Sequence, residues 1–182
     1  MRLNHPIEID LFEFFKTGKF DFLKIGQSKD WILNNFPEPD YPEEEKYLLE
    51  EDYWLYGDFE FYFTDNQLMQ ISTPHIQTLD GGKSIQVKKW IFENPENLTL
   101  QYVMAQFAKE GIGFTYRYDE RRALYQGSLG LLDKGIHLIF QPENNGEEID
   151  RKLIDPNSFP LQTVILTERK QLQARYHQRE SR

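Results

Sequence analysis

The sequence predicts an α+β fold in which two tandem units, each a helix followed by antiparallel strands, form one compact domain. Three observations lead to this prediction. Hydrophobic residues make up 39% and aromatic residues 15% of the 182-residue chain, enough to build a packed interior. Apolar residues recur at helical spacing in several short stretches, and stretches downstream of them have the pattern of strands. A nine-residue segment in each half can be aligned with the other without a gap.

The first half is predicted to begin with two helices. An amphipathic helix is expected over residues 7–15, with a stop at Gly18. A shorter helix is expected over 29–35, where Ser28 is a suitable N-cap and Pro37 prevents continuation.

An antiparallel meander should follow these helices. The expected strands and turns are strand 53–56, turn 57–58, strand 59–63, turn 65–66 and strand 68–72. In the middle strand, phenylalanines at alternate positions define one face, so Glu60 and Tyr62 lie on the other face.

The second half follows a similar plan. Residues 85–92 fit either a strand or a helix, and the pattern alone leaves both open. A helix is expected over 100–110, with Thr99 as its N-cap and Gly111 at its C-terminal end. The strands expected after it are 112–118, 123–132 and 136–140, with a tight turn at 133–135.

We interpret this similarity as an internal repeat. Ser28–Phe36 aligns with Thr99–Phe107, and Gly57–Phe61 aligns with Gly127–Leu131. The alternative is that two α+β halves share such a pattern by chance. With a repeat, the chain divides into an N-terminal helix and lead-in (1–22), a first repeat (23–75), a connector (76–97), a second repeat (98–145) and a C-terminal segment (146–182).

The C-terminal tail differs in charge from the rest of the chain. Residues 168–182 contain five basic and two acidic residues, which leaves a net charge of −12 on the residues before them. This tail could extend a helix, but its position and composition favour disorder or fraying.

The first repeat carries a pattern that resembles a known group of proteins. Ile25-Gly26-Gln27-Ser28, the helix to Phe36, the Pro37–Asp40 turn and the Trp54–Phe63 hairpin are similar to the layout of small bacterial proteins with the β-lactamase inhibitor protein and outer-membrane assembly lipoprotein folds. Uncharacterised immunity-like proteins share this layout. Phe36-Pro37 stands where that layout has Leu-Gly. The resemblance implies protein binding rather than catalysis, and it assigns no binding residue.

Composition excludes several classes of function. The chain has no cysteine, so disulfide frameworks and thiolate metal sites are excluded. A net charge of −9 argues against nucleic-acid binding, which depends on basic residues. No apolar run is long enough to cross a membrane, and residues 1–10 do not resemble a signal peptide. We therefore expect a cytoplasmic protein that binds neither nucleic acid nor membrane.

No catalytic or cofactor motif is recognisable. His5, His75, His137 and His177 lack the spacing of metal ligands, and His137 is interpreted as structural. Gly81–Ser84 is interpreted as a flexible turn rather than a phosphate-binding loop, and Asp119–Arg122 as a charged hairpin tip. We expect no cofactor, no metal and no enzymatic activity.

One acidic stretch is a candidate binding site, because Tyr41, Tyr47 and Tyr53 interrupt it. The residues assigned to partner binding are Tyr41, Glu43, Glu44, Glu45, Tyr47, Glu51 and Asp52. Tyrosines anchor interfaces and carboxylates steer basic partners, so the leading hypothesis is an inhibitor or immunity-like protein that occludes a basic protein partner. The simpler interpretation is a solubilising loop.

Two alternatives remain. The chain could be a structural subunit that forms a homo-oligomer through exposed strand edges. It could also be a small-ligand-binding or enzymatic domain, with a pocket between the two repeats lined by aromatic residues such as Trp54, Tyr116 and Tyr125.

Overall fold

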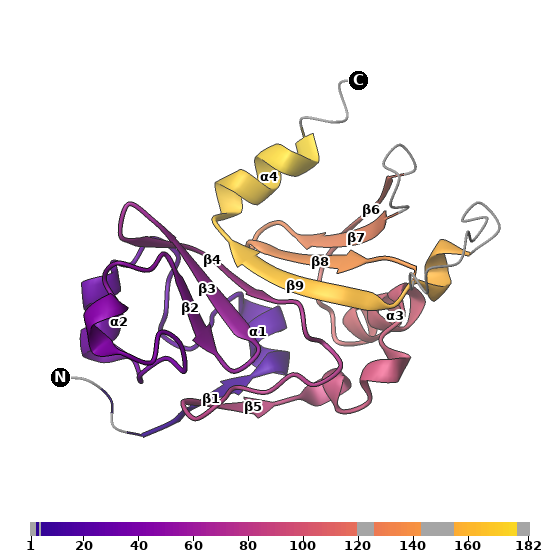
Figure 1. Cartoon of the computed structure of the whole chain (residues 1–182). Coiled ribbons are helices and arrows are strands. Elements are labelled where there is room, and N and C mark those ends of the chain that lie inside the picture. The colour runs from indigo at the N-terminus through magenta and orange to yellow at the C-terminus, as the bar shows by residue number, and fades with distance from the viewer. Residues whose placement is uncertain (1–2, 4, 120–125, 143–154, 178–182) are drawn as a thin grey trace.

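The computed structural model of the chain describes residues 3, 5–119, 126–142 and 155–177 (Figure 1). These residues form a seven-stranded antiparallel sheet, a two-stranded parallel sheet and four α-helices. The predicted α+β class is therefore confirmed. A single hydrophobic cluster runs from the N-terminal strand to the last strand of the large sheet.

The large sheet has the strand order β2-β3-β4-β9-β8-β7-β6. Its strands are β2 Tyr53–Tyr56, β3 Phe59–Thr64, β4 Gln67–Thr73, β6 Thr115–Asp119, β7 Gln126–Leu131, β8 Ile136–Phe140 and β9 Leu161–Thr167. Two three-stranded meanders thus stand on either side of β9, and all neighbouring strands are antiparallel. The predicted turns at 57–58 and 65–66 join the strands of the first meander, and Asp65 and Asn66 both have positive φ, as in a type I′ turn.

Strand β9 was not expected from the sequence. It pairs with β4 through Ile71↔Leu166 and with β8 through Leu138↔Val164, so it links the two meanders into one sheet. Part of the C-terminal segment therefore lies at the centre of the fold.

The N-terminal region combines a strand with a helix. β1 (Ile7–Asp10) pairs in parallel with β5 (Ile85–Lys88), and only then does α1 (Leu11–Thr17) begin. The prediction of a helix over 7–15 was wrong in its first turn. Asp10 marks the change, because its carboxylate accepts hydrogen bonds from the N–H groups of Phe12 and Glu13 at 2.9 and 3.2 Å, capping α1.

The remaining helices are short. They are α2 Lys29–Asn35, α3 Leu100–Lys109 and α4 Arg169–His177, with 3₁₀ turns at Glu45–Tyr47, Trp90–Glu93, Pro95–Asn97 and Pro156–Ser158. The predicted caps are confirmed: the Ser28 hydroxyl accepts from Trp31 N–H and the Thr99 hydroxyl from Tyr102 N–H. The segment 85–92, left open by the sequence, is strand β5 followed by a 3₁₀ turn.

Helices α1, α2 and α3 pack on one face of the large sheet, the inner face. Phe36, at the end of α2, contacts Tyr56 and Phe61 with ring centroids 5.4 and 6.1 Å apart. Phe15 of α1 contacts Phe107 of α3 at 5.2 Å. All five side chains are buried, so aromatic contacts form much of the core between the helices and the sheet.

Helix α4 packs on the opposite, outer face, above β7 and β8 in Figure 1. Leu172 and Tyr176 are its buried side chains, and the Tyr176 hydroxyl donates to Ser128 on β7 at 3.3 Å. The expectation of a disordered or frayed tail is therefore wrong for residues 169–177, and residues 178–182 lie outside the described part.

The two predicted repeats share local features but not their handedness. β2 and β6, the first strands of the two meanders, run in the same direction, yet the meanders advance toward β9 from opposite edges of the sheet. To superpose one meander on the other, it must be turned by half a rotation about the strand direction, which exchanges the two faces of the sheet. If the two units were equivalent, α2 and α3 would therefore lie on opposite faces. Both helices lie on the inner face, so the structure does not contain the same unit twice, and a duplication remains a prediction from the sequence.

Candidate partner-binding surface

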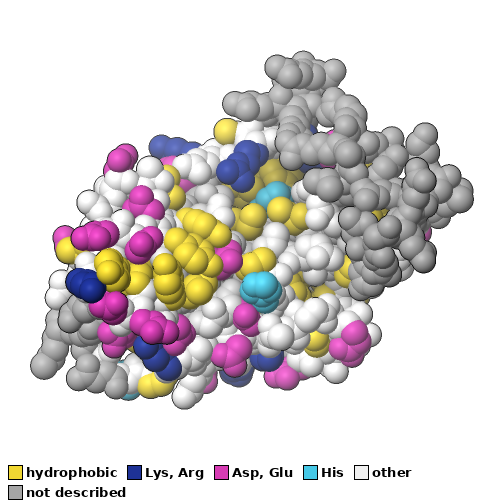
Figure 2. Space-filling model, viewed as in Figure 1, with side chains coloured by type: hydrophobic (Ala, Val, Ile, Leu, Met, Phe, Trp, Pro, Cys, Tyr) yellow, Lys and Arg dark blue, Asp and Glu magenta, His cyan; other side chains and the backbone are white. Residues whose placement is uncertain are grey.

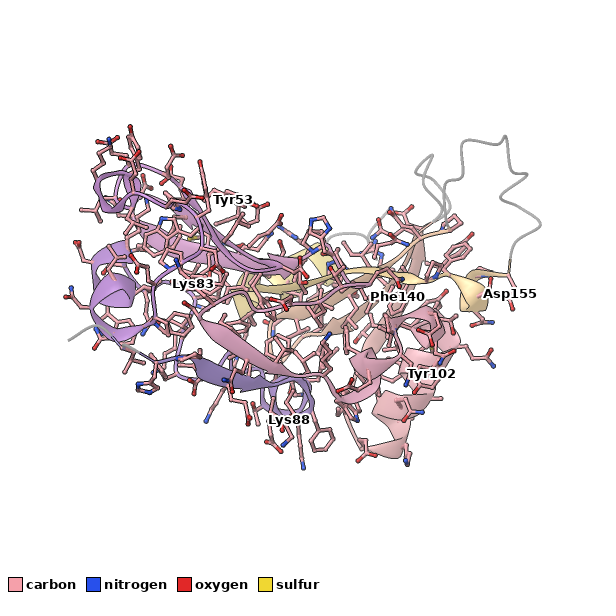
Figure 3. All side chains as sticks on the ribbon, turned by 60° about the horizontal axis from the view of Figure 1, so that its bottom comes forward. Tyr53, Lys83, Lys88, Tyr102, Phe140 and Asp155 are labelled. Carbon is pink, nitrogen blue, oxygen red and sulfur yellow. The ribbon has the colours of Figure 1, made fainter. Side chains whose placement is uncertain are left out.

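Strands β2 and β3 present a polar and aromatic outer face. Cross-strand pairing places Tyr53 opposite Tyr62 and Leu55 opposite Glu60. Tyr62 has 37% of its surface exposed, and Tyr41, which lies beside this face, has 41%. Figure 2 shows hydrophobic side chains gathered here, with Asp and Glu side chains around them. In Figure 3, Tyr53 lies on the opposite side of the molecule from Lys88 of β5.

Three aromatic rings form a continuous line on this face, which we call the tyrosine row: Tyr41, Tyr53 and Tyr62. The ring centroids of Tyr41 and Tyr53 are 6.2 Å apart, and those of Tyr53 and Tyr62 are 5.1 Å apart. These spacings are typical of favourable aromatic pairs, so the rings hold one another in place.

Glu60 lies at the end of the tyrosine row and is bound by three hydroxyl groups. Its Oε1 accepts from Tyr53 at 3.1 Å, and its Oε2 accepts from Tyr62 and from Ser72, both at 2.9 Å. Among the described residues, no lysine or arginine forms an ion pair with this carboxylate. The half-buried side chain is thus fixed in position, while the described part of the chain supplies no counter-ion for its charge.

The tyrosine hydroxyls act as donors over the whole physiological pH range. Burial raises the pKa of Tyr53 above its ordinary value, and the nearby charge of Glu60 raises it further. The pKa of Tyr62 is raised in the same direction, first by burial and then by its hydrogen bond to Glu60. The hydroxyls therefore remain protonated and keep Glu60 oriented.

Tyr41 is brought to the sheet by its own backbone. Its carbonyl accepts from Leu55 N–H at 2.9 Å, and Asp40 N–H donates to the Leu55 carbonyl at 2.7 Å. The Asp40 carboxylate accepts from Gly57 N–H at 2.7 Å and from Lys83 N–H at 3.3 Å. Asp40 thus links its own loop to the β2–β3 turn and to the turn at Gly81–Ser84. In that second turn, the backbone N–H of Lys83 donates to a carboxylate of the chain itself.

The other predicted binding residues are exposed or are engaged within the chain. Glu43, Glu44 and Glu51 are exposed, and the side chain of Glu45 lies outside the described part. Tyr47 is 39% exposed. Lys46 Nζ lies 2.7 Å from the Glu44 carboxylate and 4.6 Å from the centre of the Tyr47 ring, so this charge pair is local.

Asp52 has a partner within the chain. Its Oδ1 lies 2.8 Å from Nζ of Lys29, whose side chain is only 1% exposed. The same ammonium donates to the Leu49 carbonyl at 3.1 Å and lies 5.4 Å from the centre of the Phe63 ring. Asp52 therefore fixes the acidic segment against α2.

The aromatic residues proposed to line a pocket do not meet. Trp54 is fully buried on β2, where its Nε1–H donates to the Leu48 carbonyl, whereas Tyr116 lies on β6 at the other edge of the sheet. Tyr125 is outside the described part. The interior beneath β4 and β9 holds a cavity of about 20 Å³, which has room for one water molecule.

Among the described residues, no group of histidine and carboxylate side chains is arranged to hold a metal ion. His137 lies on β8 as predicted, with its ring edge-on to Tyr176 at 5.7 Å. None of the described helices has the length and hydrophobicity that a membrane span requires.

Sequence reasoning named Tyr53 among the tyrosines of the acidic stretch, but it did not assign Glu60, Tyr62 or Ser72 to the site. The positions of Glu60 and Tyr62 could have been predicted from the hairpin sequence. The two-residue turn at 57–58 sets the register between β2 and β3, and the alternating phenylalanines of β3 show which face of the strand is buried. Glu60 and Tyr62 must then lie beside Leu55 and Tyr53. Ser72 could not be placed in this way, because β4 joins β3 through an irregular register at Tyr62/Phe63.

No protein-family model, curated protein or solved structure matches this chain significantly. The arrangement of the tyrosine row and Glu60 is therefore the basis on which a function can be argued.

Proposed function

We propose that the chain is a non-enzymatic protein-binding module that takes a basic protein partner on the tyrosine row, Glu60 and the adjacent acidic segment 43–51. Binding occludes the partner, as an inhibitor or immunity-like protein would. The observation that carries the proposal is Glu60: a carboxylate oriented by three hydroxyl groups and bordered by aromatic rings, with which no lysine or arginine of the described residues forms an ion pair.

The aromatic residues would supply the affinity. Tyrosine buries a large rigid surface at low entropic cost and is enriched where interfaces are most sensitive to mutation. The rings of Tyr53 and Tyr62 already pack against each other, so little conformational freedom is lost when a partner covers them.

The charge distribution would raise the rate of association with the partner and select basic proteins over acidic ones. Residues 1–167 carry a net charge of −12, and Glu43, Glu44 and Glu51 are exposed within three residues of Tyr41 or Tyr53 along the chain. A field of this sign attracts basic proteins and repels acidic ones, and it acts mainly on the association rate.

The experiment is a comparison of variants in affinity capture from a lysate of the source organism, quantified by mass spectrometry and followed by binding kinetics on each recovered protein. Tyr53→Ser combined with Tyr62→Ser should weaken binding of a true partner at least about tenfold, because such anchors contribute most of the binding energy. The control is Tyr116→Ser, a tyrosine with 42% exposure at the far edge of the sheet.

A second comparison tests steering. Replacing Glu43, Glu44 and Glu45 by lysine should slow association while leaving dissociation nearly unchanged. If every recovered protein binds the tyrosine variant and the Tyr116→Ser control equally well, the proposed function is wrong.

A further inference from the structure

Glu60 has a limited number of hydrogen-bonding positions left. A carboxylate offers about four acceptor positions, two on each oxygen. Tyr62 and Ser72 both donate to Oε2, and Tyr53 donates to Oε1. Oε2 is therefore fully engaged, and one position remains on Oε1.

From this geometry, and resting on the proposed function, we infer that the partner contacts Glu60 with a single lysine ammonium group. An ammonium is a compact charge that can donate one hydrogen bond to one oxygen. An arginine binds a carboxylate best through two parallel hydrogen bonds, one to each oxygen. That arrangement would require Oε2 to release Tyr62 or Ser72.

The neighbouring rings suit the same cation. An ammonium is attracted to the face of an aromatic ring within about 6 Å of its centre, and the attraction grows as water is excluded. Tyr53 and Tyr62 flank the carboxylate that would hold it, and both donate their hydroxyls to that carboxylate.

This combination occurs twice among the residues that the structure describes. Lys46 lies at a carboxylate and over the ring of Tyr47, and buried Lys29 lies at Asp52 and over the ring of Phe63. In both cases a lysine ammonium has a carboxylate on one side and an aromatic ring on another. Glu60 with Tyr53 and Tyr62 presents the same two elements without the lysine.

The test uses the full-length chain, labelled with ¹³C and ¹⁵N, and three capped glycine pentapeptides that carry lysine, arginine or norleucine at the centre. Each peptide is titrated while NMR signals of the Glu60 carboxyl carbon and the rings of Tyr53 and Tyr62 are followed. The lysine peptide should shift these signals saturably and bind about fivefold more tightly than the arginine peptide. The norleucine peptide should leave the Glu60 signal unchanged.

Two variants make the inference specific. Glu60→Gln should abolish the effect of the lysine peptide, whereas Glu96→Gln, at an exposed position on the 3₁₀ turn Pro95–Asn97, should preserve it. Tyr62→Phe keeps the ring but removes one of the two donors to Oε2. This change frees a position on Oε2, so that an arginine can bind both oxygens, and should reduce the preference for lysine over arginine.

Equal or tighter binding of the arginine peptide to the unmodified chain would overturn the inference, as would lysine binding that survives Glu60→Gln. If capture of a protein partner still depends on Tyr53 and Tyr62 in either case, the proposed function stands and only the lysine assignment fails. If neither the peptides nor the partner respond to the variants, both fail.

Discussion

The ion pair between Lys29 and Asp52 is asymmetric. The lysine side chain is 1% exposed and the aspartate side chain is 67% exposed. A buried cation that loses its partner keeps its desolvation cost, whereas an exposed carboxylate that loses its partner is solvated by water. The two residues should therefore respond differently to substitution.

We expect Asp52→Ala to lower the free energy of unfolding by about 2–3 kcal/mol, because it leaves the ammonium of Lys29 buried without a counter-charge. Lys29→Met should cost less, about 1 kcal/mol, since it removes the buried charge and keeps most of the apolar stem. Urea unfolding measures both, and Glu51→Ala is the control at an exposed neighbouring position. A larger loss for Lys29→Met than for Asp52→Ala would contradict this account.

His137 is held neutral beneath α4. Burial, assisted by the positive charges of Arg175 on α4 and Arg117 on β6, lowers the pKa of its imidazole from 6.5 to about 4. Its Nδ1 is buried and finds no hydrogen-bond partner among the described residues. Tyr176 is the ring packed against it. Protonation would therefore place a third positive charge in this region.

This histidine makes stability depend on pH in a defined window. In the unfolded chain it takes up a proton near pH 6.5, but in the folded chain only near pH 4. Its contribution is therefore complete above about pH 6.5 and is lost as the pH falls to about 4, amounting to at most about 3 kcal/mol. His137→Phe should remove this part of the pH dependence, whereas replacement of exposed His75 should not. The check is urea unfolding between pH 4 and 7; parallel curves for His137→Phe and the unmodified chain would refute it.

At the level of the elements, α4 depends on a glycine of β7. A Cβ atom at Gly130 would lie 2.6 Å from the Tyr176 ring, closer than real contacts allow. Tyr176 also donates to Ser128, and Arg117 donates to the carbonyl of Arg175 at 3.1 Å. The helix is thus attached through its two buried side chains, Leu172 and Tyr176, and the Tyr176 ring lies directly over Gly130.

Gly130→Ala should displace α4 while the sheet remains folded. We expect amide hydrogen exchange to accelerate over residues 169–177 with little change in β3 and β4, and stability to fall by about 1–3 kcal/mol. Gly113→Ala is the matched control, because a Cβ atom there meets no atom within 4 Å. Unchanged exchange in α4 would show that Tyr176 tolerates the added methyl group.

Predictability from the sequence differed between elements for physical reasons. The β2–β3 hairpin and the caps of α2 and α3 depend on neighbouring residues, so the local sequence specifies them. β1 was taken for part of a helix because its partner β5 is distant in the chain. In the site, the hairpin places Tyr53, Glu60 and Tyr62, whereas Tyr41 reaches the face only through contacts of Asp40 with remote segments.

For the whole molecule, β9 is the strand that unites the sheet. It has β4 on one side and β8 on the other, and its buried residues Val164 and Leu166 face the inner core. Without it, each meander would have an unpaired inner edge and an incompletely covered apolar face. Stability of the two halves should therefore depend on β9 more than on α4.

Two truncated chains test this dependence. A chain of residues 1–168 lacks α4 but keeps β9, and we expect it to retain dispersed NMR signals and a cooperative urea transition. A chain of residues 1–160 lacks both elements and should lose the cooperative transition. Cooperative unfolding of the shorter chain would show that the meanders are independent of β9.

The position of β9 also bears on how the protein is made. Both meanders leave the ribosome before β9, the strand that pairs with them. The backbone N–H and C=O groups of β4 and β8 that later bond to β9 are therefore unpaired while synthesis continues. During that interval the two edges can pair with strands of other nascent chains. The order of elements along this chain thus makes the final strand a safeguard against aggregation, acting only when translation has passed Thr167.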